Sequence, residues 1–155
     1  MEKVLKSPGK YVQGYGVLDK LHKYLNKLGD NAFIIVSSGG KERFGQRIEQ
    51  IKEHDLDCTF GVADGKCLQS QIERLVEELR TTNCNIVVGV GGGAIVDTAK
   101  AVSYYAGLPL ALIPTTVSSN APGSTISVIK GDDGVSESVF ATFLDAPYTP
   151  VAPTP

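Results

Sequence analysis

Three consecutive glycines, Gly91, Gly92 and Gly93, stand between an apolar run at 86–90 and a stretch of helical periodicity at 95–106. Glycine has no Cβ, so the backbone can approach a bound anion closely. The first amides of a helix have no partner within it, and the positive end of the helix dipole stabilises negative charge. This junction therefore predicts a phosphate-binding loop. The alternative is a turn whose glycines only allow the strand and the helix to pack closely.

The glycine run departs from two better-known nucleotide motifs. If 89–94 is taken as G-x-G-x-x-A, an acidic residue is expected about 20 positions later, but Pro109 stands there with no carboxylate nearby in the sequence. The G-K-[ST] signature of phosphate-transferring enzymes is also missing, because Ala94 and Ile95 follow the glycines. The pattern favours binding of a phosphate over its transfer.

A second set of polar side chains follows Pro114. Short hydrogen-bonding side chains crowd the next eleven residues: Thr115, Thr116, Ser118, Ser119, Asn120, Ser124 and Thr125. Such a loop can bind hydroxyl and phosphate groups. The same composition is also typical of an ordinary connection rich in serine, threonine and proline.

The elements that position these loops alternate between short apolar runs and amphipathic stretches. Strands are predicted at 11–14, 32–36, 58–63, 86–90 and 110–113, and helices at 17–28, 44–51, 72–79 and 95–106. This alternation is typical of a parallel sheet wrapped by right-handed crossovers, so the predicted fold class is α/β, a Rossmann-like sheet with flanking helices. In such sheets ligands bind beyond the carboxyl ends of the strands, where the loops at 37–40, 91–93 and 114–120 would meet.

The C-terminal part of the chain has a different character. Residues 125–130 and 135–143 are predicted to pair as a β-hairpin. The last nine residues contain four prolines, so 145–155 is predicted to be an extended tail that forms neither a central strand nor a helix. The expected organisation is a nucleotide-binding α/β domain at 1–144 followed by this tail.

Composition restricts the class of protein further. With 155 residues, of which 42% are hydrophobic, the chain can bury one core. A formal net charge of −2 and dispersed basic residues argue against a nucleic-acid partner. The three cysteines have neither C-x-x-C spacing nor a nearby pair of histidines, and His22, a lone histidine among lysines, is expected at the surface. Neither a signal-peptide pattern nor a run of 18 apolar residues occurs, so we expect a cytoplasmic protein with no membrane partner.

Three separated segments together resemble one family. They are Ser7-Pro-Gly-Lys-Tyr-Val-Gln-Gly14, Gly91-Gly-Gly-Ala-Ile-Val-Asp-Thr-Ala-Lys-Ala101 and Pro114-Thr-Thr-Val-Ser-Ser-Asn-Ala-Pro-Gly-Ser-Thr-Ile-Ser-Val128. In order and spacing they resemble the N-terminal half of glycerol dehydrogenases, within the iron- or zinc-dependent alcohol dehydrogenase family, over residues 3–144. The resemblance implies an enzyme that transfers hydride between a small polyol or secondary alcohol and NAD or NADP. It also implies Zn²⁺ or Fe²⁺ in the full-length enzyme, bound in a helical domain that is absent from this chain.

The resemblance assigns cofactor-binding roles to ten residues: Ser37, Gly91, Gly92, Gly93, Asp97, Thr115, Ser118, Ser124, Ile126 and Lys130. The glycines would hold the diphosphate. Thr115 and Ser118 would contact the adenine side and the phosphates. The nicotinamide and its ribose would be lined by Ser124, Ile126 and Lys130. Asp97 and Lys100 belong to the motif either as its support or as an exposed i,i+3 pair on a helix.

Several departures from the family pattern bear on function. Ser37 stands where the family usually carries an acidic residue for the adenosine ribose, and nearby Lys41 and Arg43 could favour a 2′-phosphate, so NAD and NADP both stay open. Asn120, the candidate residue on the substrate side, stands where glycerol dehydrogenases commonly carry aspartate. Its amide can bind a hydroxyl but cannot act as a base. No residue is assigned as a metal ligand.

The sequence therefore predicts the NAD(P)-binding domain of a glycerol dehydrogenase-like oxidoreductase. Without a Lewis acid to lower the pKa of the alcohol, this chain alone is expected to be inactive or nearly so. The alternative is a non-catalytic nucleotide-binding or self-associating fragment, in which an exposed apolar surface would drive formation of a homo-oligomer.

Overall fold

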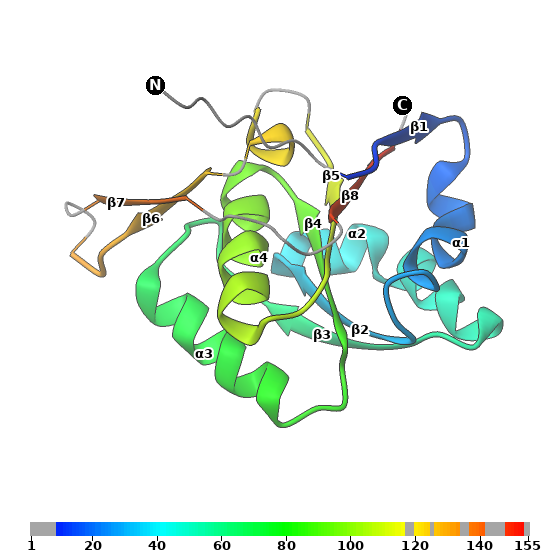
Figure 1. Ribbon diagram of the computed structural model, residues 1–155, viewed down its shortest axis with the longest axis horizontal. Helices are drawn as coiled ribbons and strands as arrows, with labels where there is room; N and C mark the ends of the chain where they lie inside the picture. Colours follow the sequence, from blue (N-terminus) through cyan, green and yellow to red (C-terminus); the bar gives the residue numbers. More distant parts are fainter. Residues whose placement is uncertain (1–8, 117–119, 125, 134–136, 142–147, 154–155) are drawn as a thin grey trace, which may run out of the picture.

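The computed structural model describes residues 9–116, 120–124, 126–133, 137–141 and 148–153, the last two ranges as backbone. One parallel sheet has the order β1-β8-β5-β4-β2-β3, and a separate antiparallel hairpin pairs β6 with β7 (Figure 1). The strands of the large sheet are β1 (Val12–Gly14), β2 (Asn31–Val36), β3 (Asp57–Val62), β4 (Ile86–Gly91), β5 (Leu110–Pro114) and β8 (Tyr148–Pro153). The predicted Rossmann-like α/β fold is confirmed.

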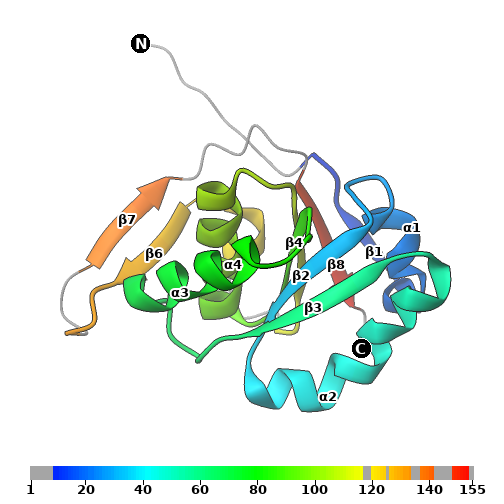
Figure 2. The ribbon, with the colours of Figure 1, turned by 90° about the horizontal axis from the view of Figure 1, so that it is seen from below.

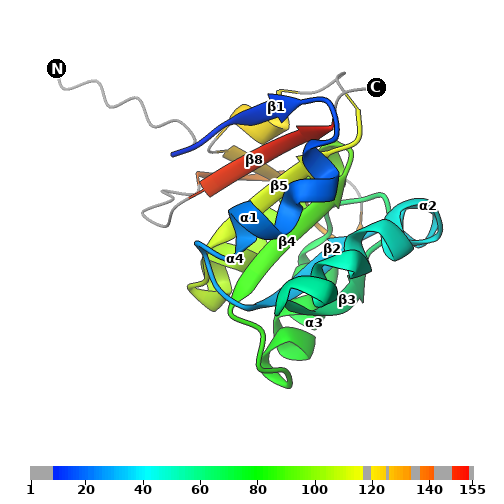
Figure 3. The same ribbon diagram turned by 90° about the vertical axis from the view of Figure 1, so that its right-hand side faces the viewer.

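Helices cover both faces of this sheet. They are η1 (Val17–Lys20), α1 (Leu21–Leu25), α2 (Ser38–Glu49), η2 (Gln50–His54), α3 (Gln69–Arg80), α4 (Gly93–Ala106) and η3 (Ala121–Gly123). Figure 2 shows α3 and α4 on one face and α1 and α2 on the other, and Figure 3 shows α1 and α2 in front of the strands. None of the helices in the described part of the chain combines the length and apolar character needed to cross a membrane.

Alternation along the central strands divides the core into two apolar clusters. In β2, Phe33 and Ile35 belong to the cluster beneath α3 and α4, whereas Ile34 and Val36 belong to the cluster beneath α1 and α2. All four side chains are fully or almost fully buried. Because both faces of the sheet are covered, its central strands are apolar at every position rather than at alternate ones.

The hairpin lies outside the large sheet and packs on α4. Its strands are β6 (Ile126–Lys130) and β7 (Glu137–Ala141), as predicted, with Ile126 opposite Ala141. Ser127 and Ile129 are buried, while Ile126 and Val128 on the other face of β6 are exposed. The hairpin is thus attached to the same helix that begins at the glycine run.

The C-terminal segment corrects one prediction. Residues 148–153 form β8, which lies inside the sheet between β1 and β5, so this segment is not an extended tail outside the sheet. Its first three residues pair with Leu110–Leu112 of β5, and its last three pair with β1. Proline fixes φ near an extended value and removes only its own N–H donor, so two ladders this short can tolerate proline. The sheet continues past the boundary predicted after residue 144.

Candidate functional site

The carboxyl ends of β2, β4 and β5 meet at one edge of the sheet. Val36 pairs with Val90, and Gly91 pairs with Pro114, so the loops that follow the three strands emerge side by side. The Thr115 N–H donates to the Gly91 carbonyl at 3.0 Å and ties two of these loops together. The structure brings together the segments that the sequence placed at a common ligand-binding edge.

The positions of the glycines in this region differ in whether packing requires glycine there. A Cβ on Gly89 would lie 2.5 Å from the Cβ of Ala99, and one on Gly91 would lie 2.8 Å from the Cβ of Ile95. Both distances are too short for packed atoms, so these two glycines are needed for α4 to approach the sheet. Among the described residues, the atom nearest to a Cβ on Gly92 would be the Thr116 Oγ1, at 3.7 Å. Packing within the described residues therefore explains Gly89 and Gly91 but not Gly92.

Helix α4 begins at Gly93, and its N-cap residue, Gly92, has no side chain that could cap it. The Val96 N–H is the first to bond within the helix, to the Gly92 carbonyl at 3.0 Å. The three preceding amides, those of Gly93, Ala94 and Ile95, therefore have no acceptor within the helix. At the positive end of a 14-residue helix, these donors suit an anion such as a diphosphate.

Helix α2 begins differently on the neighbouring strand. The Ser37 Oγ accepts a hydrogen bond from the Gly40 N–H at 3.1 Å and caps the helix. The loop predicted at 37–40 is therefore largely helical, because this cap offsets the weak helix propensity of two glycines. A Cβ on Gly40 would lie 2.8 Å from the Val36 Cγ2, so glycine is needed here for packing.

Two basic side chains lie on the first turns of α2. The Lys41 Nζ lies 5.2 Å from the centre of the Phe60 ring. The Arg43 Nε donates to the Gly39 carbonyl at 3.2 Å. Both residues are exposed, so they place positive charge close to Ser37 without burying it.

The loop after β5 contains one candidate, Thr116, to which the family resemblance assigned no role. Thr115 is half-buried, whereas Thr116 is exposed and its Oγ1 is the nearest atom to the open position on Gly92. Thr116 comes two residues after Pro114, which pairs with Gly91, and this proximity to the glycine run is the signal that could have identified it. Ser118 lies outside the described residues. Asn120 is exposed, and its carbonyl accepts the Gly123 N–H at 3.0 Å at the start of η3.

Asp97 and Lys100 form a buried pair. The Lys100 side chain is 0% exposed and that of Asp97 15%, with the Nζ and Oδ1 atoms 3.3 Å apart. The Lys100 Nζ also donates to the Ile126 carbonyl at 3.0 Å. Burial lowers the pKa of Lys100, an effect that the charge of Asp97 opposes. The interpretation of these residues as an exposed helix pair is therefore wrong.

The remaining candidates lie on or next to β6. The Ser124 Oγ accepts the Ile126 N–H at 3.1 Å, and the Lys130 N–H donates to the Cys67 carbonyl at 2.8 Å. Lys130 and Asp97 line one pocket of about 220 Å³, together with Gly65, Lys66, Cys67, Ala94 and Val128. This pocket lies beside the first two turns of α4, adjacent to the glycine run.

The histidines and cysteines of the described residues do not form a metal site. Within the described residues, no group of three or more His, Cys, Asp or Glu side chains could hold a metal ion. His22 is half-buried rather than solvated among lysines, because its ring stacks on that of His54 with centroids 3.6 Å apart. Cys58 and Cys67 are buried free thiols, and burial raises the pKa of each.

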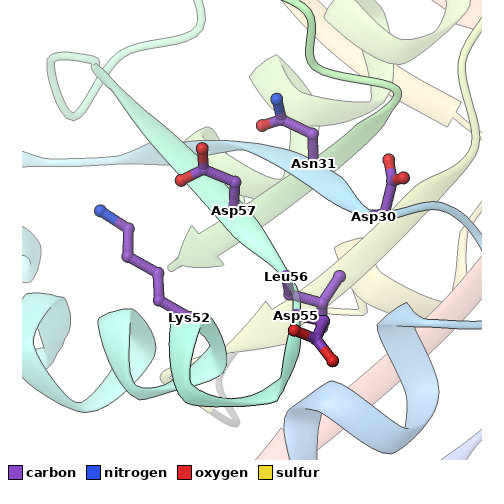
Figure 4. Close-up of a pocket in the computed structure, with 6 residues that line it drawn as sticks. All are labelled: Asp30, Asn31, Lys52, Asp55, Leu56 and Asp57. Atoms are coloured by element: carbon purple, nitrogen blue, oxygen red, sulfur yellow. The ribbon is translucent and has the colours of Figure 1, made fainter.

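A larger pocket opens at the opposite edge of the sheet. Its volume is about 430 Å³, and Figure 4 shows its lining by Asp30, Asn31, Lys52, Asp55, Leu56 and Asp57. Two of its carboxylates are already used within the protein. The Asp30 Oδ1 accepts from the Asn85 Nδ2, and the Asp57 Oδ1 accepts from the Cys58 N–H, both at 2.8 Å. The candidate loops at the carboxyl edge lie at the other end of these strands.

Known proteins resemble this chain over almost its entire length. The family described as iron-containing alcohol dehydrogenase matches residues 8–149. The glycerol dehydrogenase of Citrobacter freundii is 38% identical over 97% of this chain and 40% of its own length. The glycerol dehydrogenase of Thermotoga maritima is 35% identical over 92% of this chain and 38% of its own length. The structure of a probable glycerol dehydrogenase from Sinorhizobium meliloti 1021 superposes with a TM-score of 0.86 at 33% identity, covering 97% of this chain and 41% of that protein. The chain thus spans about two-fifths of the length of these relatives.

Proposed function

Because this chain belongs to the iron-containing alcohol dehydrogenase family, we propose that it is the coenzyme-binding part of a dehydrogenase that acts on a small polyol or secondary alcohol. Its ligand is a nicotinamide dinucleotide, bound at the carboxyl edge of the sheet. Its similarity to two glycerol dehydrogenases supports this class of substrate.

The observation that carries the proposal is the open position on Gly92. Among the described residues an added Cβ would make only an ordinary contact, with Thr116, so their packing does not require glycine there. Glycine is required if a ligand occupies that space, because a side chain would then displace the ligand. The uncapped start of α4 supplies the donors that a diphosphate needs.

The rest of the dinucleotide would follow from this anchor. Gly93 and the hydroxyls of Thr115 and Thr116 would lie beside the diphosphate, and we assign Ser118 to the same group of contacts. The nicotinamide and its ribose would lie along Ser124, Ile126 and Lys130, near Asp97. Asn120 would face the substrate hydroxyl as a hydrogen-bonding group rather than as a base.

The adenosine ribose would lie at the start of α2. The side-chain oxygen of Ser37 is engaged in capping this helix, and Lys41 and Arg43 supply positive charge nearby. A 2′-phosphate is compatible with that setting, whereas the free ribose hydroxyls would lack a carboxylate acceptor at Ser37. NAD and NADP are both within the proposal, and the charge favours NADP.

The proposal for the described residues stops at coenzyme binding. The metal that the family name implies would polarise the substrate hydroxyl, but the described side chains offer it no cluster of three ligands. We therefore expect turnover by this chain alone to be negligible.

Fluorescence titration of the 155-residue chain with NADH and NADPH tests the proposal. We expect saturable binding of at least one of them, and we expect Gly92→Val to weaken it by more than about a hundredfold while the circular dichroism spectrum is retained. Gly45→Ala is the matched control, because its added Cβ makes only ordinary contacts, the nearest at 3.5 Å, in the middle of α2. Absence of binding to the unaltered chain, or equal binding by the Gly92→Val protein, contradicts the proposal.

A further inference from the structure

One buried cation has no part in the proposed function so far. Lys100 lies in the second half of α4, and its side chain is completely buried. It therefore cannot touch a bound dinucleotide. Among the described residues, its Nζ donates hydrogen bonds to the Asp97 carboxylate and to the Ile126 carbonyl.

Asp97 extends these contacts to the next residues of β6. Its Oδ2 accepts from the Val128 N–H at 3.4 Å, and its main-chain carbonyl accepts from the Ser127 Oγ at 3.3 Å. Three successive residues of β6 are thus bonded to one turn of α4. Because two of these contacts use main-chain atoms of alternate residues, they fix how far β6 can slide along the helix.

An apolar contact between α4 and β6 is already present, since Ile129 is buried in the same cluster as the helix. Apolar side chains of similar volume often stabilise a protein as well as a buried ion pair does, because the pair must be stripped of water. What the pair adds is a fixed position of β6 on the helix, since hydrogen bonds tolerate little displacement of donor from acceptor.

Both ends of the proposed coenzyme site depend on α4. The proposed diphosphate donors are the first amides of this helix, and the strand assigned to the nicotinamide end is fixed to its second turn. The Asp97 side chain also lines the pocket of about 220 Å³ that contains Lys130. The position of β6 on α4 thus sets the spacing between the two parts of the site.

We propose that the Asp97–Lys100 pair is a positioning device that holds β6 in register with the start of α4, so that the diphosphate and nicotinamide ends of the dinucleotide bind simultaneously. Lys100 is a positioning residue and contacts no ligand. This inference rests on the proposed function, because the nicotinamide end is assigned to β6 by the family resemblance.

Two ligands separate the effects on the two ends of the site. ADP-ribose carries the adenosine, the diphosphate and a ribose but no nicotinamide, whereas NADH carries all of them. We expect the unaltered chain to bind NADH more tightly than ADP-ribose. In Lys100→Met we expect the Kd for NADH to rise about tenfold while that for ADP-ribose changes by less than about twofold. A general loss of stability would weaken both ligands alike.

A milder pair of variants covers the case in which Lys100→Met does not fold. Ser127→Ala removes one hydrogen bond to Asp97 and no charge, and we expect it to raise the Kd for NADH about threefold, again with little change for ADP-ribose. Ser103→Ala is the matched control, since this buried hydroxyl of α4 bonds to the Leu108 carbonyl at 2.6 Å, away from β6. It should leave the ratio of the two Kd values unchanged.

The outcomes distinguish the two proposals. If the unaltered chain binds neither of these ligands and does not bind NADPH, the proposed function fails. If it binds both, but the ratio of their Kd values stays the same in Lys100→Met and in Ser127→Ala, the positioning role is overturned and coenzyme binding stands. Equal affinity of the unaltered chain for NADH and ADP-ribose would also overturn it, since β6 would then contribute nothing to binding.

Discussion

Helices α2 and α4 start at the same edge of the sheet, after strands that are direct neighbours. At the start of α2, Ser37 turns its own hydroxyl to the Gly40 amide and closes the helix. At the start of α4, Gly92 has no side chain with which to do so. Two helices in nearly the same setting therefore treat their first amides in opposite ways.

Under the proposed function, the protein itself caps the start of α2, whereas a ligand would occupy the start of α4. A serine cap in place of glycine is worth a few tenths of a kcal/mol to a helix, so the open start of α4 forgoes a small amount of stability. A bound diphosphate would supply the missing acceptors. The hollow of about 430 Å³ at the amino edge offers no comparable set of open donors, and two of its carboxylates, those of Asp30 and Asp57, already accept hydrogen bonds from the protein.

The largest effect is expected when the two adjacent glycines at the start of α4 are each replaced by alanine and the losses of stability are compared. Gly91→Ala would place a Cβ 2.8 Å from the Cβ of Ile95, so the free energy of unfolding should fall by about 2 kcal/mol through overpacking. Gly92→Ala should change it by less than about 0.5 kcal/mol. Urea unfolding followed by circular dichroism measures both. Equal losses would show that Gly92 is also a packing residue and would remove the main support for the ligand assignment.

A transplanted cap tests the comparison directly. Gly92→Ser gives α4 the kind of cap that α2 has, so the free energy of unfolding should rise by a few tenths of a kcal/mol. The same side chain competes with the diphosphate for space and donors, and the Kd for the preferred dinucleotide should rise about tenfold. Thermal unfolding and fluorescence titration report the two effects. Unchanged affinity would contradict the assignment of these amides to the ligand.

The smallest effect is expected at the start of α2. Ser37→Asp keeps a good cap, because aspartate and serine are similarly effective there, but it adds a negative charge. Repulsion of about 1 kcal/mol should shift the ratio of NADPH to NADH affinity about fivefold towards NADH. Ser37→Ala is the control for the lost hydroxyl, without added charge. If Ser37→Asp leaves the ratio where Ser37→Ala puts it, the adenosine ribose does not lie at this helix.

Much of the fold could be predicted because hydrophobic periodicity reports burial directly. The runs at 32–36 and 86–90 are apolar at almost every position, and both are central strands covered on two faces. The strand β8 could not be predicted from its prolines, because its place in the sheet depends on β1 and β5, which lie far away in the sequence. Local propensity was overridden there by pairing.

The candidate site was predicted by residue type more than by arrangement. The sequence identified the glycine run, but it could not distinguish Gly91 from Gly92. The neighbours of each position do so, because a side chain on Gly91 would collide with Ile95. The burial of Lys100 was also beyond local reasoning, since its partner carbonyl, that of Ile126, lies 26 residues further along the chain. Helical spacing alone could not separate a buried i,i+3 pair from an exposed one.

The most direct test is an amide map of the unaltered chain in solution. Titration of the ¹⁵N-labelled protein with whichever of NADH and NADPH binds should shift the amide resonances of Gly92, Gly93 and Ala94 most, with that of Thr116 next. Saturable shifts centred on these residues are the predicted result. Shifts confined to the pocket around Asp30 and Asp57, or no saturable shift at the start of α4, would contradict it.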